Sequence, residues 1–182
     1  MKSRLLFITL FGFILLLGVS DRAAAQVGVS TDARLGITFP VGDLSSDTEG
    51  GVVLGANVAV DVLPRLSVYA GVNRHTFRCS GDCGQLGADP RSTGVGAGLR
   101  FDFPSPQEAV WWGRAGIVGH QFSSDLVTGD REVGLELGAG VDMPVRGGVK
   151  VSPMVGLINH AVAPSLSARY LTFGVGLSYR FR

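Results

Sequence analysis

Charged residues recur at alternate positions in this 182-residue chain, mostly on the same face as glycines and other small residues. Acids and bases balance, five of each: Asp32, Arg34, Asp61, Arg100, Asp102, Arg114, Glu136, Asp142, Lys150 and Arg180. If this face lines the narrow interior of the protein, unpaired charges there would be costly. The acidic and basic residues of the set are therefore expected to pair with one another. The pattern predicts a structural ion-pair network, and a gated path for ions is the alternative.

Three histidines, His75, His120 and His160, have the phase of the charged face and fall near the ends of their segments. Imidazole is a common metal ligand. These residues come from the third, fifth and seventh alternating segments, however, so one shared site would require them to converge from strands that are not neighbours. We expect the three histidines to make hydrogen bonds near the ends of their strands, at the rim of the fold. We expect no metal and no other cofactor.

The two cysteines, Cys79 and Cys83, lie in one short connection. In an exported chain, two nearby cysteines favour a local disulfide. Metal binding is the alternative, but two thiols without an adjacent histidine make a poor site. A disulfide here would shape the tip of the connection.

The N-terminus has the pattern of an export signal. Lys2 and Arg4 precede an apolar run over 5–19, and small residues at 23–25 provide a cleavage site. A membrane anchor is the alternative, but the run is short. We therefore predict a signal peptide over 1–25 and one domain over 26–182. The chain has 16 basic and 15 acidic residues, and nothing in this balance suggests nucleic acid.

Eight segments with apolar residues at alternate positions can be drawn after the signal, each long enough to cross a bilayer as a tilted strand. They cover 30–39, 51–62, 66–77, 93–103, 109–122, 132–143, 149–160 and 169–181. Their connections alternate between short and long. This alternation predicts an all-β fold, an eight-stranded antiparallel up-and-down transmembrane β-barrel with short periplasmic turns and longer external loops.

The apolar face could point inward, as in a soluble barrel, or outward to lipid. Glycines share the charged face, and a narrow lumen needs small residues, so we expect the apolar face outside. Aromatic residues gather at the segment ends near the long connections (Phe39, Phe77, Phe122 and Tyr170) and near the short ones (Phe101, Phe103, Trp111, Trp112, Tyr179 and Phe181). The pattern predicts two aromatic belts at the membrane interfaces.

The chain resembles the small outer-membrane barrels of Gram-negative-type bacteria, the group of the OmpA transmembrane domain, OmpX and the opacity proteins. The most specific motif is the C-terminal assembly signal, matched by Phe173, Val175, Leu177, Tyr179 and Phe181; Arg182 departs from it, because the family usually ends on the aromatic. The resemblance implies a location in the outer membrane, surrounded by lipid, and an interaction with the barrel-assembly machinery through Tyr179 and Phe181.

Some eight-stranded barrels hydrolyse acyl esters of lipid A with a His-x-Ser motif. None of the three histidines here has a serine two places later, so we expect no enzyme. The long connections are rich in acidic residues, which favours plain solubility over binding of divalent cations or a basic partner. We expect a monomeric barrel with a structural or adhesion-type surface role, in which the loops could bind a surface ligand. A narrow porin for small solutes is the alternative.

Overall fold

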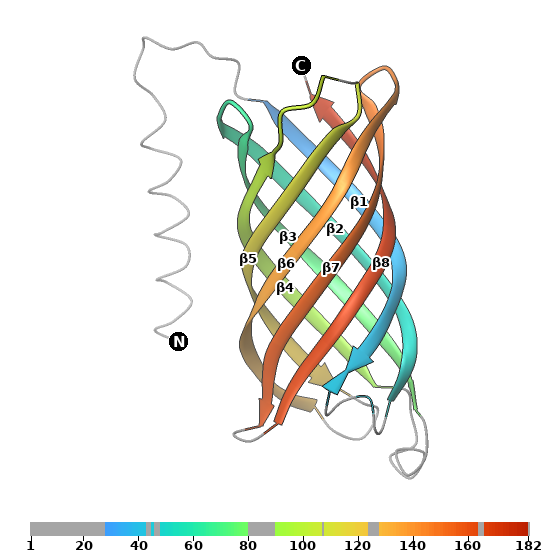
Figure 1. Cartoon of the computed structure of the whole chain (residues 1–182). Coiled ribbons are helices and arrows are strands. Elements are labelled where there is room, and N and C mark those ends of the chain that lie inside the picture. The colour runs from blue at the N-terminus through green and yellow to red at the C-terminus, as the bar shows by residue number, and fades with distance from the viewer. Residues whose placement is uncertain are drawn as a thin grey trace.

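The chain forms a closed barrel of eight antiparallel strands in sequence order, in a computed structural model that describes residues 28–42, 45, 48–79, 90–106, 108–123, 128–163 and 166–181 (Figure 1). Each strand pairs with its neighbours in the chain, and β1 closes the ring with β8. Every strand therefore has two partners, so the sheet has no open edge. The predicted signal peptide lies outside the described residues.

The eight strands confirm the eight segments and in most cases extend beyond them toward the loops. They are β1 (Val29–Val41), β2 (Thr48–Leu63), β3 (Leu66–Cys79), β4 (Arg91–Asp102), β5 (Val110–Ser123), β6 (Thr128–Arg146), β7 (Val149–Ala163) and β8 (Leu166–Phe181). Arg78, Arg91 and Arg131, which lie just outside the predicted segments, belong to strands β3, β4 and β6.

Two of the short connections are tight two-residue turns. Gly147 and Gly148 join β6 to β7 with φ values of 62° and 83°, which glycine adopts without steric cost. Pro64 and Arg65 join β2 to β3, where Arg65 has a φ of 72°. These turns and the end of β8 lie at the upper end of the barrel in Figure 1. The other ends of the strands, between which the longer connections run in the sequence, define the opposite end of the barrel, which we call the loop end.

The strands are staggered around the barrel. Pairing partners followed from Val29 through β2 to β8 lead back to Phe39, ten residues further along β1. A closed barrel with this stagger must have strongly tilted strands, as Figure 1 shows. Each step along a row of paired residues therefore climbs toward the loop end, and residues at one level of the barrel come from different rows.

The outer face of the barrel is apolar. Leu35, Ile117, Leu135, Leu137 and Val175 are each more than half exposed. A continuous apolar surface of this kind is stable only when lipid covers it, because water would make its exposure costly. The barrel therefore spans a membrane. Among the described residues, no helix is long and apolar enough to do so.

The aromatic belts differ from the prediction. At the turn end Phe101, Phe103, Trp111, Tyr179 and Phe181 face outward, as expected, but Trp112 points inward and is buried. Of the four residues predicted for the loop-end belt, Phe39 alone faces outward. Phe77 and Tyr170 are buried inside, and Phe122 packs against their cluster. The prediction of a second belt was wrong, because position at a strand end was given more weight than the phase of the side chain.

Candidate functional site

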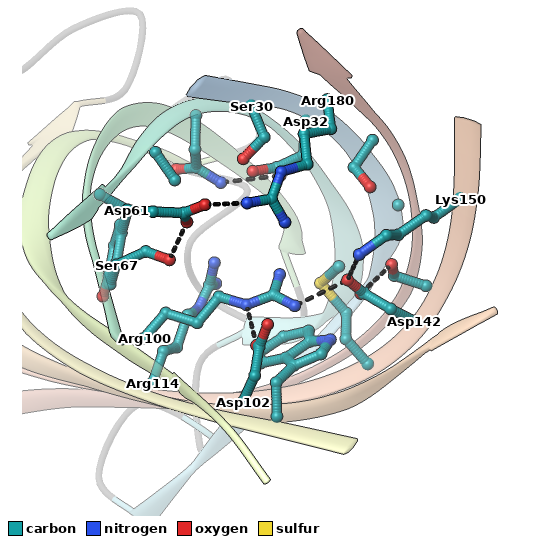
Figure 2. A pocket seen from close by; sticks show the side chains of 18 residues that line it. Ser30, Asp32, Asp61, Ser67, Arg100, Asp102, Arg114, Asp142, Lys150 and Arg180 are labelled. Carbon is teal, nitrogen blue, oxygen red and sulfur yellow. Dashed lines mark hydrogen bonds and ion pairs between the residues drawn. The ribbon is translucent and has the colours of Figure 1, made fainter. Parts of the chain in front are cut away.

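The interior of the barrel holds most of the polar side chains, and it is the candidate site. All ten residues of the predicted ion-pair network have the inward phase. All of them except Arg34 and Glu136 line a cavity of about 50 Å³ at the turn end, into which the labelled side chains of Figure 2 point. That volume is room for a few water molecules at most.

Asp142 is the centre of the network at the turn end. Nη2 of Arg100 lies 2.7 Å from Oδ2 of Asp142, and Nζ of Lys150 lies 3.2 Å from the same oxygen. Ser152 donates a hydrogen bond of 2.6 Å to the other oxygen. Arg100 also pairs with Asp102 at 2.9 Å, and its guanidinium lies 4.7 Å from the ring centre of Trp112. Asp142 is almost fully buried, so its pairing offsets a large desolvation cost.

Two further polar contacts lie at the turn end, the first at the barrel mouth and the second deeper inside. Arg180 pairs with Asp61, and Ser67 donates a hydrogen bond of 2.8 Å to Asp61. Asp32 instead accepts a hydrogen bond of 2.9 Å from the Asn57 side chain. The Arg180–Asp61 pair is more exposed than Asp142, with side chains 53% and 30% exposed against 2%, whereas Ser67 and Asn57 are buried.

Glu136 occupies the middle of the barrel between two arginines. Its Oε1 lies 2.5 Å from Nη2 of Arg114 and 3.6 Å from Nη1 of Arg34. Both contacts are ion pairs that do not have hydrogen-bond geometry. Oε1 has no hydrogen-bond partner among the described residues. Arg114 also lies over the ring of Tyr69, at 5.4 Å from its centre. The inner face is glycine at Gly138 because a Cβ there would be 2.9 Å from Nε of Arg114.

Above Glu136, toward the loop end, a layer of rings fills the interior. We call His75, His120, His160 and Tyr170 the His–Tyr layer. The ring centres of His75 and His120 are 5.7 Å apart, and those of His120 and His160 are 5.1 Å apart with nearly parallel planes. Tyr170 lies 5.0 Å from His75 and 5.6 Å from His160. All four residues are buried.

The stagger of the strands explains this convergence. His75, His120 and His160 come from β3, β5 and β7, and each lies at a different row of the sheet. Because each strand-to-strand step climbs toward the loop end, the three reach the same level. Gly94 on β4 leaves room for His120, since a Cβ there would be 2.5 Å from its Nε2. The three histidines therefore do converge, contrary to the argument from strand order, while His120 and His160 make hydrogen bonds near the loop end as predicted.

The His–Tyr layer has few hydrogen bonds for its polarity. The Tyr170 hydroxyl lies 2.5 Å from Nε2 of His160 and 3.1 Å from Oγ of Ser92. Oγ of Ser92 lies 2.7 Å from Nδ1 of His120. Both ring nitrogens of His75 have no hydrogen-bond partner among the described residues. Phe77, Val118 and Ile158 surround the layer with apolar contacts.

The layer could suggest a metal site or a Ser–His nucleophile. In the described part of the chain, no group of three or more His, Cys, Asp or Glu side chains is arranged to hold a metal ion. Ser92 and His120 do form a hydrogen-bonded pair, but Nε2 of His120 has no carboxylate partner in the described chain, and both residues are 0 % exposed. A nucleophile needs both an oriented base and substrate access. The Ser92–His120 pair has neither, so its hydrogen bond is part of the packing of the interior.

Two other predicted features are only partly described. Cys79 ends β3 and is disulfide-bonded, but Cys83 lies outside the described residues, so its pairing with Cys79 stays a prediction. Of the assembly signal, Tyr179 and Phe181 face outward with their rings in edge contact, 5.0 Å apart. Arg182 lies outside the described residues, as do most acidic residues of the long connections.

Tyr170, Ser92 and Trp112 are interior residues that the sequence pattern was not used to predict. The signal was available in the phase: Leu171 and Phe173 face outward, so Tyr170 must face inward, and Trp111 and Trp112 must point to opposite sides. Nothing in the sequence shows the stagger that brings the rings to one level.

Solved structures share this architecture at low sequence identity. Neisserial surface protein A matches with a TM-score of 0.69 and 16% identity over 88% of this chain and 100% of that chain. The outer membrane protein OprG of Pseudomonas aeruginosa matches with a TM-score of 0.61 and 11% identity, over 86% and 96%. Ail, the attachment invasion locus protein of Yersinia pestis, gives 0.55 and 14%, over 85% and 99%. No family model and no curated protein matches the sequence.

These likenesses, together with the apolar outer face and the closed eight-stranded ring, define the class. The chain has the fold of the small eight-stranded outer-membrane barrels of bacteria. At these low identities the comparisons show the fold alone. The activity has to be argued from the interior and the surface of this chain.

Proposed function

We propose that this protein is a non-conducting outer-membrane barrel that acts as a structural and surface-interaction protein through its loop end. The observation that carries the proposal is the His–Tyr layer, which occupies the lumen between the ion-pair network and the loop end. Two cavities in the described part of the interior have volumes of only about 50 and 20 Å³. A barrel filled in this way offers solutes no open path, so its interactions occur outside the lumen.

The interior polar groups support a structural role. The buried carboxylates Glu136 and Asp142 each contact two cations, and these charges neutralise one another instead of lining a water-filled path. Ail, which shares the fold, is an attachment and invasion protein, and it has been solved in complex with a heparin analogue. That example supports a surface-binding role for the loop end and does not identify a ligand for this chain.

A narrow porin is the second candidate. The cavity of about 50 Å³ between the charges of the turn end favours it, because a rearrangement of Arg100 or Arg180 could connect that cavity to the periplasm. The His–Tyr layer would still have to open at the other end. A hydrolase is not supported, because Ser92 and His120 have no access to substrate.

Planar-bilayer conductance of the refolded full chain tests the proposal. The wild-type barrel should give no steady channel. A variant with Tyr170→Ala and His160→Ala removes two of the rings that block the lumen and should give measurable conductance. The matched control is Tyr179→Ala, which removes a ring of similar size from the outer face and should stay silent. Steady conductance of the wild type would refute the non-conducting barrel and favour the porin.

Cell attachment tests the surface role. Cells that carry the wild-type chain should bind a host-type surface better than cells in which residues 80–89 are replaced by a short Gly-Ser connection, with equal amounts of barrel in the membrane. Equal attachment for this variant, and for a matching replacement of residues 124–127, would contradict a surface-interaction role of these loops.

A further inference from the structure

Arginines gather on the outer face near the loop end, where the apolar surface stops. Arg74 and Arg78 of β3, Arg131 of β6 and Arg169 of β8 are exposed and have the outward phase of their strands, and Arg91 of β4 is half-buried. We call these five residues the arginine girdle.

The stagger of the strands places the girdle at one height. Arg78, Arg91, Arg131 and Arg169 lie on different rows of paired residues, but the climb of the rows around the barrel brings them to within about two residues of one level, with Arg74 slightly below. The aromatic belt at the turn end lies about eleven residues of strand lower. With the strand tilt, that separation is roughly 25 Å, the height of the apolar band of an outer-membrane barrel.

The two interfaces of the barrel therefore differ in chemistry. The turn-end interface is aromatic, with Trp111, Phe101 and Tyr179 facing outward. The loop-end interface is basic, and Phe39 is the outward aromatic ring found there among the described residues. A barrel in a symmetric, neutral bilayer would have no reason for this difference. An outer leaflet that carries more negative charge at its surface would favour it.

Part of the girdle forms a compact cluster. On the β3–β4 pair, Arg91 lies directly opposite Thr76, so Arg74 and Arg78 are its two diagonal neighbours on the same face. Diagonal positions are roughly 7–8 Å apart, within reach of long side chains. Three guanidinium groups can therefore converge on one anion. Guanidinium matches phosphate with two parallel hydrogen bonds, and a cluster of them selects phosphate over a neutral headgroup.

Protein carboxylates do little to neutralise the four exposed arginines of the girdle, whereas Arg91 has a further interaction within the chain. Within the described chain, no ion pair involves Arg74, Arg78, Arg131 or Arg169. Glu49 lies opposite Arg78 across the β2–β3 pair and is the nearest carboxylate in register. The other flanking groups are hydrogen-bonding side chains, such as Gln121 opposite Arg131 and Asn159 opposite Arg169.

We propose that the arginine girdle binds the phosphate groups of an anionic outer-leaflet lipid of the lipid A type, with Arg74, Arg78 and Arg91 as the principal site. The occupant is a lipid because the girdle lies on the membrane-facing surface, directly at the edge of the apolar band. This inference rests on the outer-membrane location and is independent of whether the lumen conducts.

Native mass spectrometry of the full chain tests the proposal. The barrel is released from nanodiscs of phosphatidylcholine, phosphatidylglycerol and diphosphoryl lipid A, and each bound lipid is counted. Lipid A should be retained in preference to phosphatidylglycerol, and dephosphorylated lipid A should be lost. Arg74→Gln with Arg91→Gln should weaken lipid A retention by about tenfold or more, because each arginine contributes charge-assisted hydrogen bonds to the phosphate. Arg65→Gln with Arg146→Gln, at the turn end, is the matched control and should retain lipid A as the wild type does.

Equal retention by the wild type and the Arg74/Arg91 variant would overturn the proposal, as would equal retention of phosphatidylglycerol and lipid A. Should the double variant fail to close, as judged by heat-modifiable gel migration, Arg91→Lys carries the test. It keeps the charge but loses the two-pronged contact, and a several-fold loss is expected. Failure of the wild type to insert into any bilayer would refute the membrane location itself, which distinguishes the two failures.

Discussion

The Tyr170 hydroxyl lies 2.5 Å from Nε2 of His160 on the neighbouring strand, inside the barrel. Tyr170 is 0 % exposed, and it also lies beside Ser92. The Tyr170→Phe variant keeps the ring but removes the hydroxyl, so His160 and Ser92 each lose one hydrogen bond in the buried interior. We expect it to lower the free energy of unfolding by about 1–2 kcal/mol, measured by urea unfolding in detergent or lipid. Tyr179→Phe, on the lipid face, is the control and should change stability by less than about 0.5 kcal/mol. Equal effects of the two variants would contradict a hydrogen-bonded His–Tyr layer.

Burial should decide the cost of breaking an ion pair in this barrel. Glu136 is 2 % exposed and contacts both Arg34 and Arg114, so Glu136→Gln leaves two arginines in the interior with their counter-charge removed. A loss of about 3–5 kcal/mol in unfolding free energy is expected. Arg180, whose side chain is 53% exposed, pairs with Asp61 near the mouth, and Arg180→Gln should cost no more than about 1 kcal/mol. The ranking is the test, and an equal or reversed ranking would show that the centre of the barrel is hydrated.

The side of the barrel wall on which a residue lies should decide how a substitution near the membrane midplane destabilises the barrel. Leu137 is 53% exposed to lipid, and Leu137→Arg should destabilise the barrel by about 2–4 kcal/mol in bilayers. The same change at Val145, near the turn end, should be milder because the charge can reach water. Gly138→Arg should prevent closure by crowding Arg114, so its gel migration should be the same with and without boiling. A harmless Leu137→Arg would indicate that the outer face was misassigned.

The last strand should carry the assembly signal, a prediction still to be tested. Tyr179 and Phe181 lie on the outer face of β8, where an unpaired strand could add to a sheet edge of the assembly machinery. Tyr179→Ala with Phe181→Ala should block insertion in cells, while the purified chain still folds in detergent. Normal insertion followed by reduced stability would make both rings interface anchors only. Deletion of Arg182 should be neutral or mildly favourable to assembly.

The period-two pattern was sufficient to predict the strands, their order and the facing of most residues. Leu137 and Glu136 illustrate why: in a barrel wall, adjacent positions must point to opposite sides, so one correct assignment determines the rest of the strand. The glycines at 147 and 148 also indicated where one strand ends and the next begins. Local physics of this kind can be read from the sequence.

The His–Tyr layer and the arginine girdle could not be predicted in the same way. His75 and His160 are 85 positions apart, and their common level depends on the stagger of all eight strands, which the pattern within each strand does not contain. Phe77 and Tyr170 were assigned to an outer belt because aromatic residues are frequent at membrane interfaces. Their positions in the alternation of the two strands indicated that both side chains point inward. In the structure both are buried inside the barrel.

The two tryptophans of the chain provide the most direct test of which face meets lipid. Trp111 is 61% exposed on the outer face, and Trp112, the next residue, is 3% exposed inside the barrel beside Arg100. Each is isolated by changing the other to phenylalanine, and its fluorescence is measured in bilayers with and without brominated acyl chains. We predict strong quenching when only Trp111 remains and little when only Trp112 remains. Quenching of Trp112 with protection of Trp111 would contradict a barrel whose apolar face meets lipid and whose interior is polar and filled.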